Sequence, residues 1–388
     1  MLTPEQTAIV KATVPLLETG GEALTTHFYT IMLAEYEEVR PLFNQAHQSR
    51  GTQPRALANA VLLYARHIDE LGALGTLAGQ IIQKHVALQI LPEHYPIVGT
   101  CLLRAIREVL GAQIATDDVI DAWGAAYWQL ANLLMGAEAV EYDKLEQAPG
   151  GWRGARPFRI ARKVVESAEI ISFTLAPVDG GAVIAHRPGQ YLGLRLTVDG
   201  KEVRRNYSLS QASNGRTLRI SVKREPGGVV SNHLHSLPEG AVIDVFPPAG
   251  AFVLEPGTVP LVLISGGVGI TPTLAMAEAA LVEGGREVIF IHYARNADVH
   301  AFGADIDDWA REHPHFTAHI VYEEGAAQGA PSGRPTQDHL HAWVPVEADA
   351  YVLGPKPFMG FVDRTLSAMG LPDERRHHEF FGPAEALA

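Results

Sequence analysis

Hydrophobic side chains recur every three to four positions along the first part of the chain, from Thr3 to about Tyr142. This spacing gathers them on one face of a helix. The opening residues Thr3-Pro4-Glu5-Gln6 supply a threonine cap, proline at the first helical position and a glutamine placed to close a capping box. Roughly six or more helices without a convincing strand predict an all-α domain. Two clear stripes are Leu57, Val61, Leu62, Ala65 and Ile68, and Leu74, Leu77, Ile81, Ile82, His85 and Leu88.

The pattern changes near residue 150. Residues 147–151 read Gln-Ala-Pro-Gly-Gly, which cannot continue a helix and predicts a linker. After it, β-branched residues alternate with polar ones in short runs separated by Gly, Pro, Asn or Asp, and such runs predict a small antiparallel barrel. The predicted strands are 158–165, 170–175, 191–198, 203–209, 218–222 and 242–245.

A third pattern, in which strand-like and helical segments alternate, begins near residue 259. Alternation of this kind predicts a parallel sheet covered by helices on both faces. The predicted strands are 260–264, 288–293, 318–322 and 350–353, and the predicted helices are 273–282, 306–311 and 358–369. We therefore expect a multidomain chain: an all-α domain (1–146), a linker (147–152), an antiparallel β-barrel (153–258) and an α/β parallel-sheet domain (259–388).

Composition narrows the class of partner. The formal net charge is −13, and no long run of Lys or Arg is present. This argues against nucleic acid or an anionic membrane as the main partner. A single cysteine, Cys101, excludes an intramolecular disulfide framework, and its helical surroundings predict a small buried apolar residue. Without a visible signal peptide or a run of about 18 apolar residues, we expect a cytoplasmic monomer with no integral membrane contact.

A glycine-rich segment, Ser265–Pro272, stands where a predicted strand ends and a helix begins. Glycines let the backbone approach a pyrophosphate, and a helix N-terminus offers free N–H groups and partial positive charge. A structural turn is the alternative. Upstream, Arg205-Asn206-Tyr207-Ser208 ends a barrel strand, where an Arg could hold a phosphate and a Tyr could stack on a flavin. Taken singly, Tyr207 could be barrel core and Arg205 a solvated edge residue.

The order of these motifs resembles the ferredoxin–NADP⁺ reductase-like family over about residues 153–383. The motifs are Arg205-x-Tyr207-Ser208, Gly227-Gly228-x-Val230-Ser231-Asn232, Gly266–Pro272, Leu353-Gly354-Pro355 and Glu379-Phe380-Phe381-Gly382-Pro383. The resemblance implies an FAD-binding barrel followed by an NAD(P)H-binding domain. Leu353 stands at a position where the family often has cysteine. This difference bears on how finely the nicotinamide would be positioned, not on whether it would bind.

The same resemblance assigns cofactor contacts residue by residue. FAD would be bound by Tyr191, Arg205, Asn206, Tyr207, Ser208, Gly228 and Ser231. The nicotinamide dinucleotide would be received by Gly267, Val268, Gly269, Ile270, Thr271 and Pro272. Phe380, Phe381, Gly382 and Pro383 would lie against the flavin.

His85 is the candidate metal ligand of the helical half, because it shares an apolar stripe with Ile81 and Ile82. A lone inward histidine is more often a hydrogen-bonded core residue than a ligand. Tyr95 and Glu138 could reach its ring if their helices pack beside it, and a carboxylate there would fix the tautomer of a ligand. The remaining candidates are predicted to be solvated or structural: His47, His67, His94, His292, His300, His377 and His378.

Residues 1 to about 145 resemble the globin of the flavohaemoglobin family. This resemblance implies a haem b bound by His85 as proximal ligand, with Tyr95 and Glu138 hydrogen-bonded around it. It also implies Tyr29 as the distal residue toward O₂, supported by Gln53. Leu57 would crowd the ligand and Phe43 would pack on the porphyrin, while Lys84 and Glu379 would lie where the haem and reductase domains face each other.

A flavin between a hydride donor and a haem can accept an electron pair and release single electrons. The family implies nitric oxide dioxygenation, in which ferrous haem binds O₂ and converts NO to nitrate while NAD(P)H re-reduces the haem through FAD. Two alternatives stay open: an O₂- or NO-binding sensor or carrier with a maintenance reductase, and a reductase for acceptors such as lipid hydroperoxides, quinones or ferric chelates. Arg295, after the second strand of the nucleotide domain, could bind a 2′-phosphate or be solvated, so NADH or NADPH could be the donor; NADH is favoured.

Overall fold

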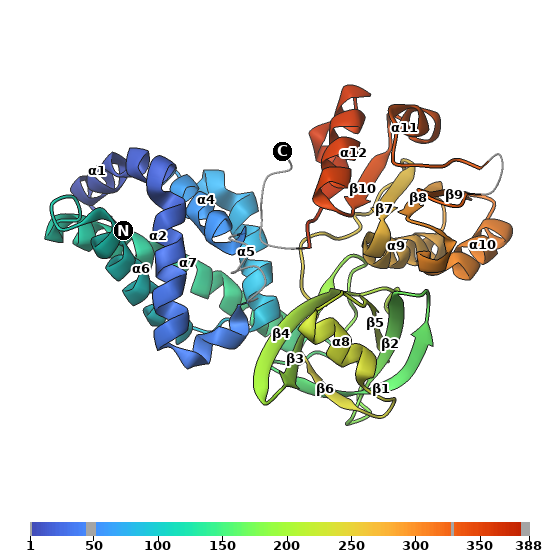
Figure 1. Ribbon diagram of the computed structural model, residues 1–388, viewed down its shortest axis with the longest axis horizontal. Helices are drawn as coiled ribbons and strands as arrows, with labels where there is room; N and C mark the ends of the chain where they lie inside the picture. The colour runs from blue at the N-terminus through green and yellow to red at the C-terminus, as the bar shows by residue number, and fades with distance from the viewer. Residues whose placement is uncertain (1, 44–51, 327–329, 382–388) are drawn as a thin grey trace. The chain divides into compact units, whose positions relative to one another are not determined.

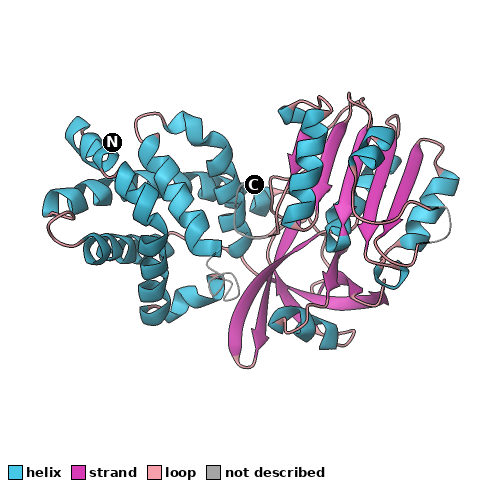
Figure 2. Cartoon of the chain, turned by 45° about the horizontal axis from the view of Figure 1, so that its top comes forward, coloured by secondary structure: helices cyan, strands magenta, loops and turns pink. Residues whose placement is uncertain are grey.

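The computed structural model describes residues 2–43, 52–326 and 330–381. Backbone contacts divide the chain into two units, one formed mainly by Met1–Glu146 and the other mainly by Gln147–Lys201 and Arg205–Phe381. Within the described residues the chain is helical up to Gln147, and its first strand begins at Arg156 (Figure 1, Figure 2). The predicted fold class, an all-α part followed by an antiparallel and then a parallel sheet, is confirmed.

The capping box that the sequence predicted at Thr3 is present in the structure. The backbone N–H of Thr3 donates to Gln6 Oε1 at 3.0 Å, and the N–H of Gln6 donates to Thr3 Oγ1 at 3.1 Å. Thr116 Oγ1 accepts from the N–H of Val119 at 3.4 Å. The elements are α1 (Pro4–Ala12), α2 (Val14–Glu35), η1 (Glu37–Leu42), α4 (Thr52–Arg66), η2 (Leu71–Leu74), α5 (Gly75–Leu88), α6 (His94–Leu110) and α7 (Asp117–Gln147).

Helix α2 lies at the centre of this unit, where it packs on α4 and α6. Its residues Phe28 and Met32 are almost fully buried, and they share one core with Trp123 of α7. Cys101 of α6 is 1% exposed in the same core, so its predicted role as a small buried apolar residue is confirmed. The amphipathic stripes of the sequence therefore meet in one helical core.

The second unit begins with an antiparallel sheet of six strands in the order β4-β3-β6-β1-β2-β5. An isolated antiparallel bridge between Leu209 and Ile220 joins the segment after β4 to β5, and the N–H of Ser210 donates to the carbonyl of Arg219 at 2.9 Å. The two edges thus meet, as in a barrel. The strands are β1 (Arg156–Val165), β2 (Ile170–Pro177), β3 (Tyr191–Val198), β4 (Lys201–Ser208), β5 (Leu218–Lys223) and β6 (Val242–Val245).

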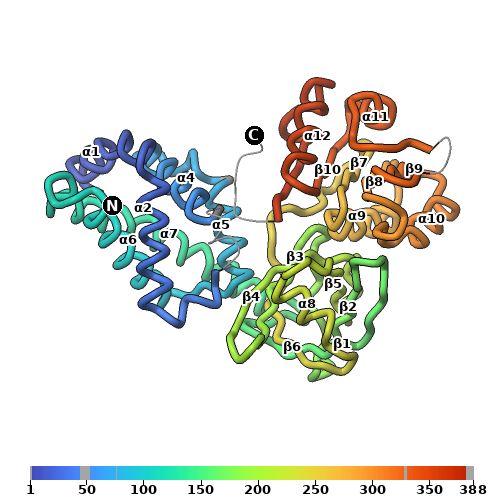
Figure 3. The backbone as a smooth tube through the Cα atoms, viewed as in Figure 1, coloured from blue at the N-terminus to red at the C-terminus, as the bar shows by residue number. Residues whose placement is uncertain are grey.

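A five-stranded parallel sheet follows, in the order β11-β10-β7-β8-β9. Alternate residues of β7 enter different cores: Leu261 and Leu263 pack with α9 and α10, whereas Val262 and Ile264 pack with α11 and α12. Helices therefore cover both faces of the parallel sheet, and Figure 3 traces the course of the chain through them. The elements are β7 (Leu261–Gly266), η3 (Gly267–Gly269), α9 (Ile270–Glu283), β8 (Val288–Ala294), η4 (Ala297–Val299), α10 (Gly303–Glu312), β9 (Phe316–Tyr322), α11 (Gln337–Trp343), β10 (Asp349–Leu353), α12 (Lys356–Ala368), η5 (Asp373–Arg375) and β11 (Arg376–His378).

Three short elements go beyond the sequence prediction. Helices α8 (Val229–Ser236) and α11 (Gln337–Trp343) are eight and seven residues long, and strand β11 (Arg376–His378) has three residues. Segments this short contain too few residues to show a recognisable hydrophobic period. Among the described residues, no helix is both long and apolar enough to cross a membrane.

Candidate functional site

His85 lies in the last turn of α5. The chain directly after this turn is held in place by side-chain hydrogen bonds. Gln89 takes a left-handed conformation with φ 56°, and its Nε2 donates to the carbonyl of Val86 at 2.9 Å. The hydroxyl of Tyr142 donates to the carbonyl of Ile90 at 2.7 Å. A helix end leaves carbonyls without intrahelical partners, and the Gln89 side chain satisfies that of Val86. Tyr142 fastens the chain two residues beyond the helix. The position of the His85 ring is therefore set by a well-tied helix terminus.

Nδ1 of His85 faces a buried carboxylate and a buried phenol. Oε1 of Glu138 lies 2.7 Å from Nδ1, and the hydroxyl of Tyr95 lies 3.2 Å from it. The hydroxyl of Tyr95 also donates to Glu138 Oε1 at 2.7 Å. Burial, followed by the hydrogen bond to Glu138, raises the pKa of Tyr95 well above its ordinary value, so the phenol stays protonated. The sequence prediction that these helices would bring the three side chains together is correct.

Residues of α6 and α7 hold Tyr95 in place. The hydroxyl of Tyr127 donates to the carbonyl of Tyr95 at 2.5 Å. A Cβ on Gly99 would lie 2.6 Å from Cε1 of Tyr127, so only glycine lets this ring approach α6 so closely. Tyr142, which ties the end of the His85 helix, stands four residues after Glu138 on the same side of α7. That spacing was the signal in the sequence by which Tyr142 could have been found.

Tyr29 of α2 lies in an aromatic pocket and is 6% exposed. Its ring meets Phe28 and Phe43 edge-on, with centroids 4.9 and 5.5 Å apart, and its hydroxyl is hydrogen-bonded to Gln53. Burial raises the pKa of Tyr29, and the Gln53 contact lowers it by less. The phenol is thus a neutral donor. Phe43 and Leu57 are half-buried against the same core.

The donor set around His85 fits a haem iron. Among the described residues, no three His, Cys, Asp or Glu side chains are arranged to hold an ion by themselves. A haem supplies most ligands from its porphyrin and needs one axial base from the protein. Because Nδ1 of His85 is engaged by Glu138, Nε2 is the nitrogen left to bind iron, and the His85 side chain is 30% exposed while Glu138 is 3% exposed.

Tyr191 and Arg205 lie at the candidate flavin site of the barrel. A Cβ on Gly250 would come within 2.8 Å of Cε1 of Tyr191, so this glycine, at φ 121°, makes room for the ring. Burial raises the pKa of Tyr191, and the charge of Glu379 raises it further, which places that carboxylate near the phenol. Burial lowers the pKa of Arg205, and the nearby Tyr207 opposes this shift.

Gly228 and Ser231 form a compact turn at the start of α8. The hydroxyl of Ser231 accepts from the N–H of Glu225 at 3.2 Å, and a Cβ on Gly228 would lie 2.6 Å from that oxygen. Asn232 fastens the same turn, because its Nδ2 donates to the carbonyls of Glu225 and Gly228 at 2.9 and 2.5 Å. The turn leaves the first N–H groups of α8 free of side-chain caps. Such a terminus suits an anion.

The glycine-rich turn lies between β7 and α9, as predicted. Gly267 has φ 55°, and a Cβ on Gly269 would lie 2.6 Å from the carbonyl oxygen of Leu353. The close approach uses the backbone of Leu353 and not its side chain, so replacing the family's cysteine leaves this packing intact. Thr271 Oγ1 donates to the carbonyl of Val268 at 3.1 Å and closes the turn. A glycine-rich turn that leads into a helix N-terminus in this way suits a pyrophosphate.

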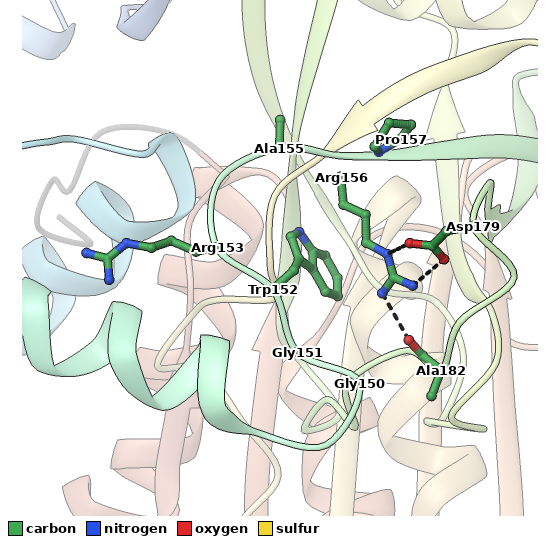
Figure 4. Close-up of a pocket in the computed structure, with 9 residues that line it drawn as sticks. All are labelled: Gly150, Gly151, Trp152, Arg153, Ala155, Arg156, Pro157, Asp179 and Ala182. Carbon is green, nitrogen blue, oxygen red and sulfur yellow. Dashed lines mark hydrogen bonds and ion pairs between the residues drawn. The ribbon is translucent and has the colours of Figure 1, made fainter.

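A surface hollow of about 590 Å³ lies elsewhere in the second unit (Figure 4). Arg156 lies over Trp152 there, 5.5 Å from the ring centroid, and donates to Asp179 at 2.9 and 2.6 Å and to the carbonyl of Ala182 at 2.9 Å. Since these contacts use Nε, Nη1 and Nη2 of Arg156, its charge is already paired. None of the residues predicted to bind a cofactor lines this hollow.

Comparison with known proteins agrees with this geometry. Three family models match the chain: "Globin" over residues 26–134, "Oxidoreductase FAD-binding domain" over 157–254 and "Oxidoreductase NAD-binding domain" over 263–364. Flavohemoproteins of Pseudomonas putida and Pseudomonas aeruginosa are 62% and 60% identical over 392 residues and cover all of both chains. The chain belongs to the flavohaemoprotein family. As a flavohaemoprotein, it has haem, FAD and NAD as its cofactors.

Two solved structures resemble this flavohaemoprotein. Flavohemoglobin from Malassezia yamatoensis, with bound FAD and haem, is similar at a TM-score of 0.88 and 25% identity, covering 98% of this chain and 100% of that one. The FAD/NAD-binding domain of nitric oxide dioxygenase from Vibrio cholerae is 37% identical at a TM-score of 0.57, covering 60% of this chain and all of that one.

The structure brings together some of the predicted site residues. His85, Tyr95 and Glu138 form one hydrogen-bonded group, and Tyr29 joins Gln53 and Phe43. Lys84 and Glu379 belong to different units of this flavohaemoprotein. Gly382 and Pro383 lie outside the described residues. Sequence reasoning did not find the buried pair in which Ser265 Oγ lies 2.9 Å from His292 Nδ1, because two residues 27 positions apart carry no local signal.

Proposed function

We propose that this flavohaemoprotein is a nitric oxide dioxygenase, which combines NO, O₂ and one electron into nitrate. Because a hydride carries two electrons, one NAD(P)H supports two turnovers. When bound, haem supplies an iron that binds O₂, and FAD separates the electron pair into single electrons. The observation that carries the proposal is the buried Tyr95–Glu138 pair on Nδ1 of His85.

Glu138 and Tyr95 act on the basicity of His85. A carboxylate that accepts the Nδ1 proton fixes the tautomer and raises the electron density at Nε2. An electron-rich axial ligand favours chemistry on bound O₂ over simple storage. The hydroxyl of Tyr95, kept protonated by burial, orients the carboxylate of Glu138 and partly neutralises it. His85 is thus the metal ligand of the proposal, and the other two residues position it.

Tyr29 would supply a hydrogen-bond donor toward O₂. Negative charge develops on oxygen as it accepts electron density, and a fixed O–H donor stabilises such charge. Since burial keeps the Tyr29 phenol protonated and Gln53 holds its oxygen, the donor needs no reorganisation. Phe43 and Leu57 contribute apolar surroundings. A hydrogen bond from Tyr29 is stronger in such surroundings than in water.

The second unit delivers electrons. Arg205, Tyr207 and Tyr191 would hold FAD, and the turn Gly267–Gly269 with the start of α9 would hold the pyrophosphate of NAD(P)H. Support comes from the relative of Vibrio cholerae, whose name is nitric oxide dioxygenase and whose described part corresponds to this unit. A carrier that only stores O₂ would not need a complete two-cofactor reductase.

Measurement of NO consumption tests the proposal. Purified protein loaded with haem and FAD is given NADH, O₂ and NO, and an NO electrode is combined with a nitrate assay. We expect continuous NO consumption with two nitrate ions formed per NADH. NADH oxidation that NO does not accelerate, or NO loss without nitrate, would contradict the proposal and favour a sensor, a carrier or a reductase for another acceptor.

A further inference from the structure

The barrel segment that follows the candidate flavin motif is fastened to helix α9 of the parallel-sheet half. The backbone N–H of Ala212, four residues after Ser208, donates to Oε2 of Glu278 at 2.6 Å. Glu278 is half-buried on α9, eight residues after its first residue, Ile270. At a rise of about 1.5 Å per residue, this contact lies about 12 Å along the helix from the end that would receive the nucleotide pyrophosphate. One hydrogen bond thus connects the two candidate cofactor regions.

The same helix packs closely on the loop that leads to Tyr191. A Cβ on Gly189 would lie 2.6 Å from Cε of Met276 in α9 and 2.2 Å from the carbonyl oxygen of Phe252. Gly189 also has φ 102°, so glycine is the residue that this close approach permits. Helix α9 therefore contacts the chain shortly before one predicted flavin residue, Tyr191, and shortly after another, Ser208.

A second tie to the segment after the flavin motif comes from Arg219 of β5. Its Nε donates to Oγ of Ser210 at 3.2 Å, and its Nη2 donates to the carbonyl of Ser210. The guanidinium also lies over the ring of Phe302, 5.6 Å from the centroid. Phe302 is 3% exposed and shares one core with Ile270 and Leu274 of α9. Arg219 therefore joins Ser210 to the core on which α9 packs.

Phe302 has an unusual backbone conformation at this junction. Its φ is 64°, in the left-handed region that a bulky side chain rarely adopts. Such a conformation persists only where the surrounding structure determines it. The barrel holds the chain four residues earlier, because the N–H of Ala168 donates to the carbonyl of Asp298 at 2.9 Å. Both halves of the unit therefore specify where the Phe302 ring lies under Arg219.

We propose that Glu278 and Arg219 are positioning residues for hydride transfer, because they hold the flavin-binding strand end and helix α9 at one fixed separation. When a hydride passes from C4 of the nicotinamide to N5 of the flavin, a C–H bond breaks, an N–H bond forms and both electrons move with the hydrogen. The reacting atoms must come within about 3–3.5 Å, so a misplacement of about 1 Å can slow the step about 100-fold. The inference rests on the proposed electron path from NADH to FAD.

Stopped-flow reduction of the flavin separates positioning from binding. The FAD-loaded full chain is mixed anaerobically with increasing NADH, and the loss of flavin absorbance gives a limiting rate and a Kd. Glu278→Ala removes the acceptor, so the limiting rate should fall about tenfold or more while the Kd of NADH stays within about twofold. Glu278→Gln keeps an acceptor oxygen and should restore most of the rate. The matched control Glu283→Ala, at an exposed position of the same helix, should change neither value.

Hydrogen–deuterium exchange at the Ala212 amide gives a readout that needs no turnover. It is measured on the oxidised, FAD-loaded chain by mass spectrometry with electron-transfer fragmentation. A hydrogen-bonded amide exchanges only when its contact opens, so exchange should be about tenfold faster in Glu278→Ala. Glu278→Gln and Glu283→Ala should exchange at the original rate. Faster exchange and slower flavin reduction, at equal FAD content and equal thermal midpoint, are the expected result.

Arg219→Lys tests the second tie independently, and it decides the question if Glu278→Ala loses its FAD. Lysine keeps the positive charge, but its single nitrogen cannot bind two atoms of Ser210 and also cover the ring of Phe302. We expect a limiting rate about fivefold lower or less, with the Kd of NADH within about twofold of its original value.

An unchanged limiting rate in both Glu278→Ala and Arg219→Lys would overturn the inference. A lower rate in Glu278→Ala that is matched by an equal rise in the Kd of NADH, or that Glu278→Gln does not restore, would also overturn it. Such results would leave the proposed function intact, because they concern only flavin reduction. Conversely, a protein whose flavin responds as expected but which does not convert NO to nitrate would retain this inference and contradict the proposed function.

Discussion

Oε1 of Glu138 lies 2.7 Å from Nδ1 of His85, and both groups are enclosed by one helical unit. The Glu138 side chain is 3% exposed and also accepts a hydrogen bond from Tyr95. A buried charge without partners costs several kcal/mol, so a carboxylate kept in this place is compensated by the groups it contacts. The hydrogen bond between Glu138 and Nδ1 holds His85 in one tautomer, as an axial ligand requires.

Replacement of Glu138 tests this relationship. Glu138→Gln keeps the shape of the side chain but removes its charge, so electron density at Nε2 of His85 should fall. The ferric–ferrous midpoint potential should then rise by about 60 mV, equal to about 1.4 kcal/mol for one electron. Spectroelectrochemistry measures the shift. Glu141→Gln, on the same helix but outside the triad, should leave the potential unchanged; an equal shift in both variants would argue against a specific effect of Glu138.

Tyr29→Phe removes a buried donor without removing its ring. One hydrogen bond contributes about 1–1.5 kcal/mol, so O₂ dissociation should become about tenfold faster. Stopped-flow displacement of O₂ by CO gives the rate. Tyr36→Phe, at the end of α2, is the control and should dissociate O₂ at the original rate. An unchanged rate in Tyr29→Phe would remove this residue from the proposed O₂ site.

Arg205→Ala should yield protein that keeps haem but loses FAD. A hydrogen bond to a charged group contributes about 1.5–3 kcal/mol, which corresponds to roughly 10- to 100-fold weaker FAD binding. The ratio of flavin to haem absorbance after dialysis measures the loss. Arg162→Ala, at an exposed position of β1, should retain FAD. Full flavin content in Arg205→Ala would exclude Arg205 as a main FAD contact.

His292 should make the stability of the second unit depend on pH. Burial, followed by the charge of His300, lowers the pKa of His292 to about 3. Between about pH 6.5 and 3 the unfolded chain binds a proton that the native chain excludes, so stability is full above 6.5 and falls as the pH decreases. Denaturant midpoints from pH 8 to 4, followed by flavin fluorescence, should show this decline. It should be shallower in His292→Asn and unchanged in His315→Asn, which alters an exposed histidine; equal slopes in all three proteins would contradict the assignment.

The sequence predicted those parts of the fold that local patterns determine. Strands β3 and β6 have the predicted bounds, because each is a short, largely hydrophobic run with glycine or proline within two residues of its end. The capping box at Thr3 and the turn at Gly267 were likewise visible, since each depends on a few neighbouring residues. By contrast, the Arg295–Glu169 pair joins residues 126 positions apart. No local sequence pattern indicates such a contact, so it can be recognised only in the folded chain.

The candidate haem site shows the same division. The position of His85 on an apolar stripe predicted only that its ring faces inward, which equally suited a core histidine. Its role depended on Glu138, 53 residues away, and on Tyr95 in another helix. Resemblance to a known family supplied that pairing before the structure did. The close approach of Tyr127 to Gly99 arises from helix packing, which hydrophobic periodicity does not specify.

The most direct test of the whole proposal is an anaerobic absorbance measurement under CO, made on the protein loaded with haem and FAD before and after NADH is added. If electrons pass from NADH through the flavin to the iron bound by His85, the flavin absorbance should fall and the Soret band should move from its ferric position to that of the CO-bound ferrous haem. A flavin that bleaches while the Soret band stays ferric would contradict the account.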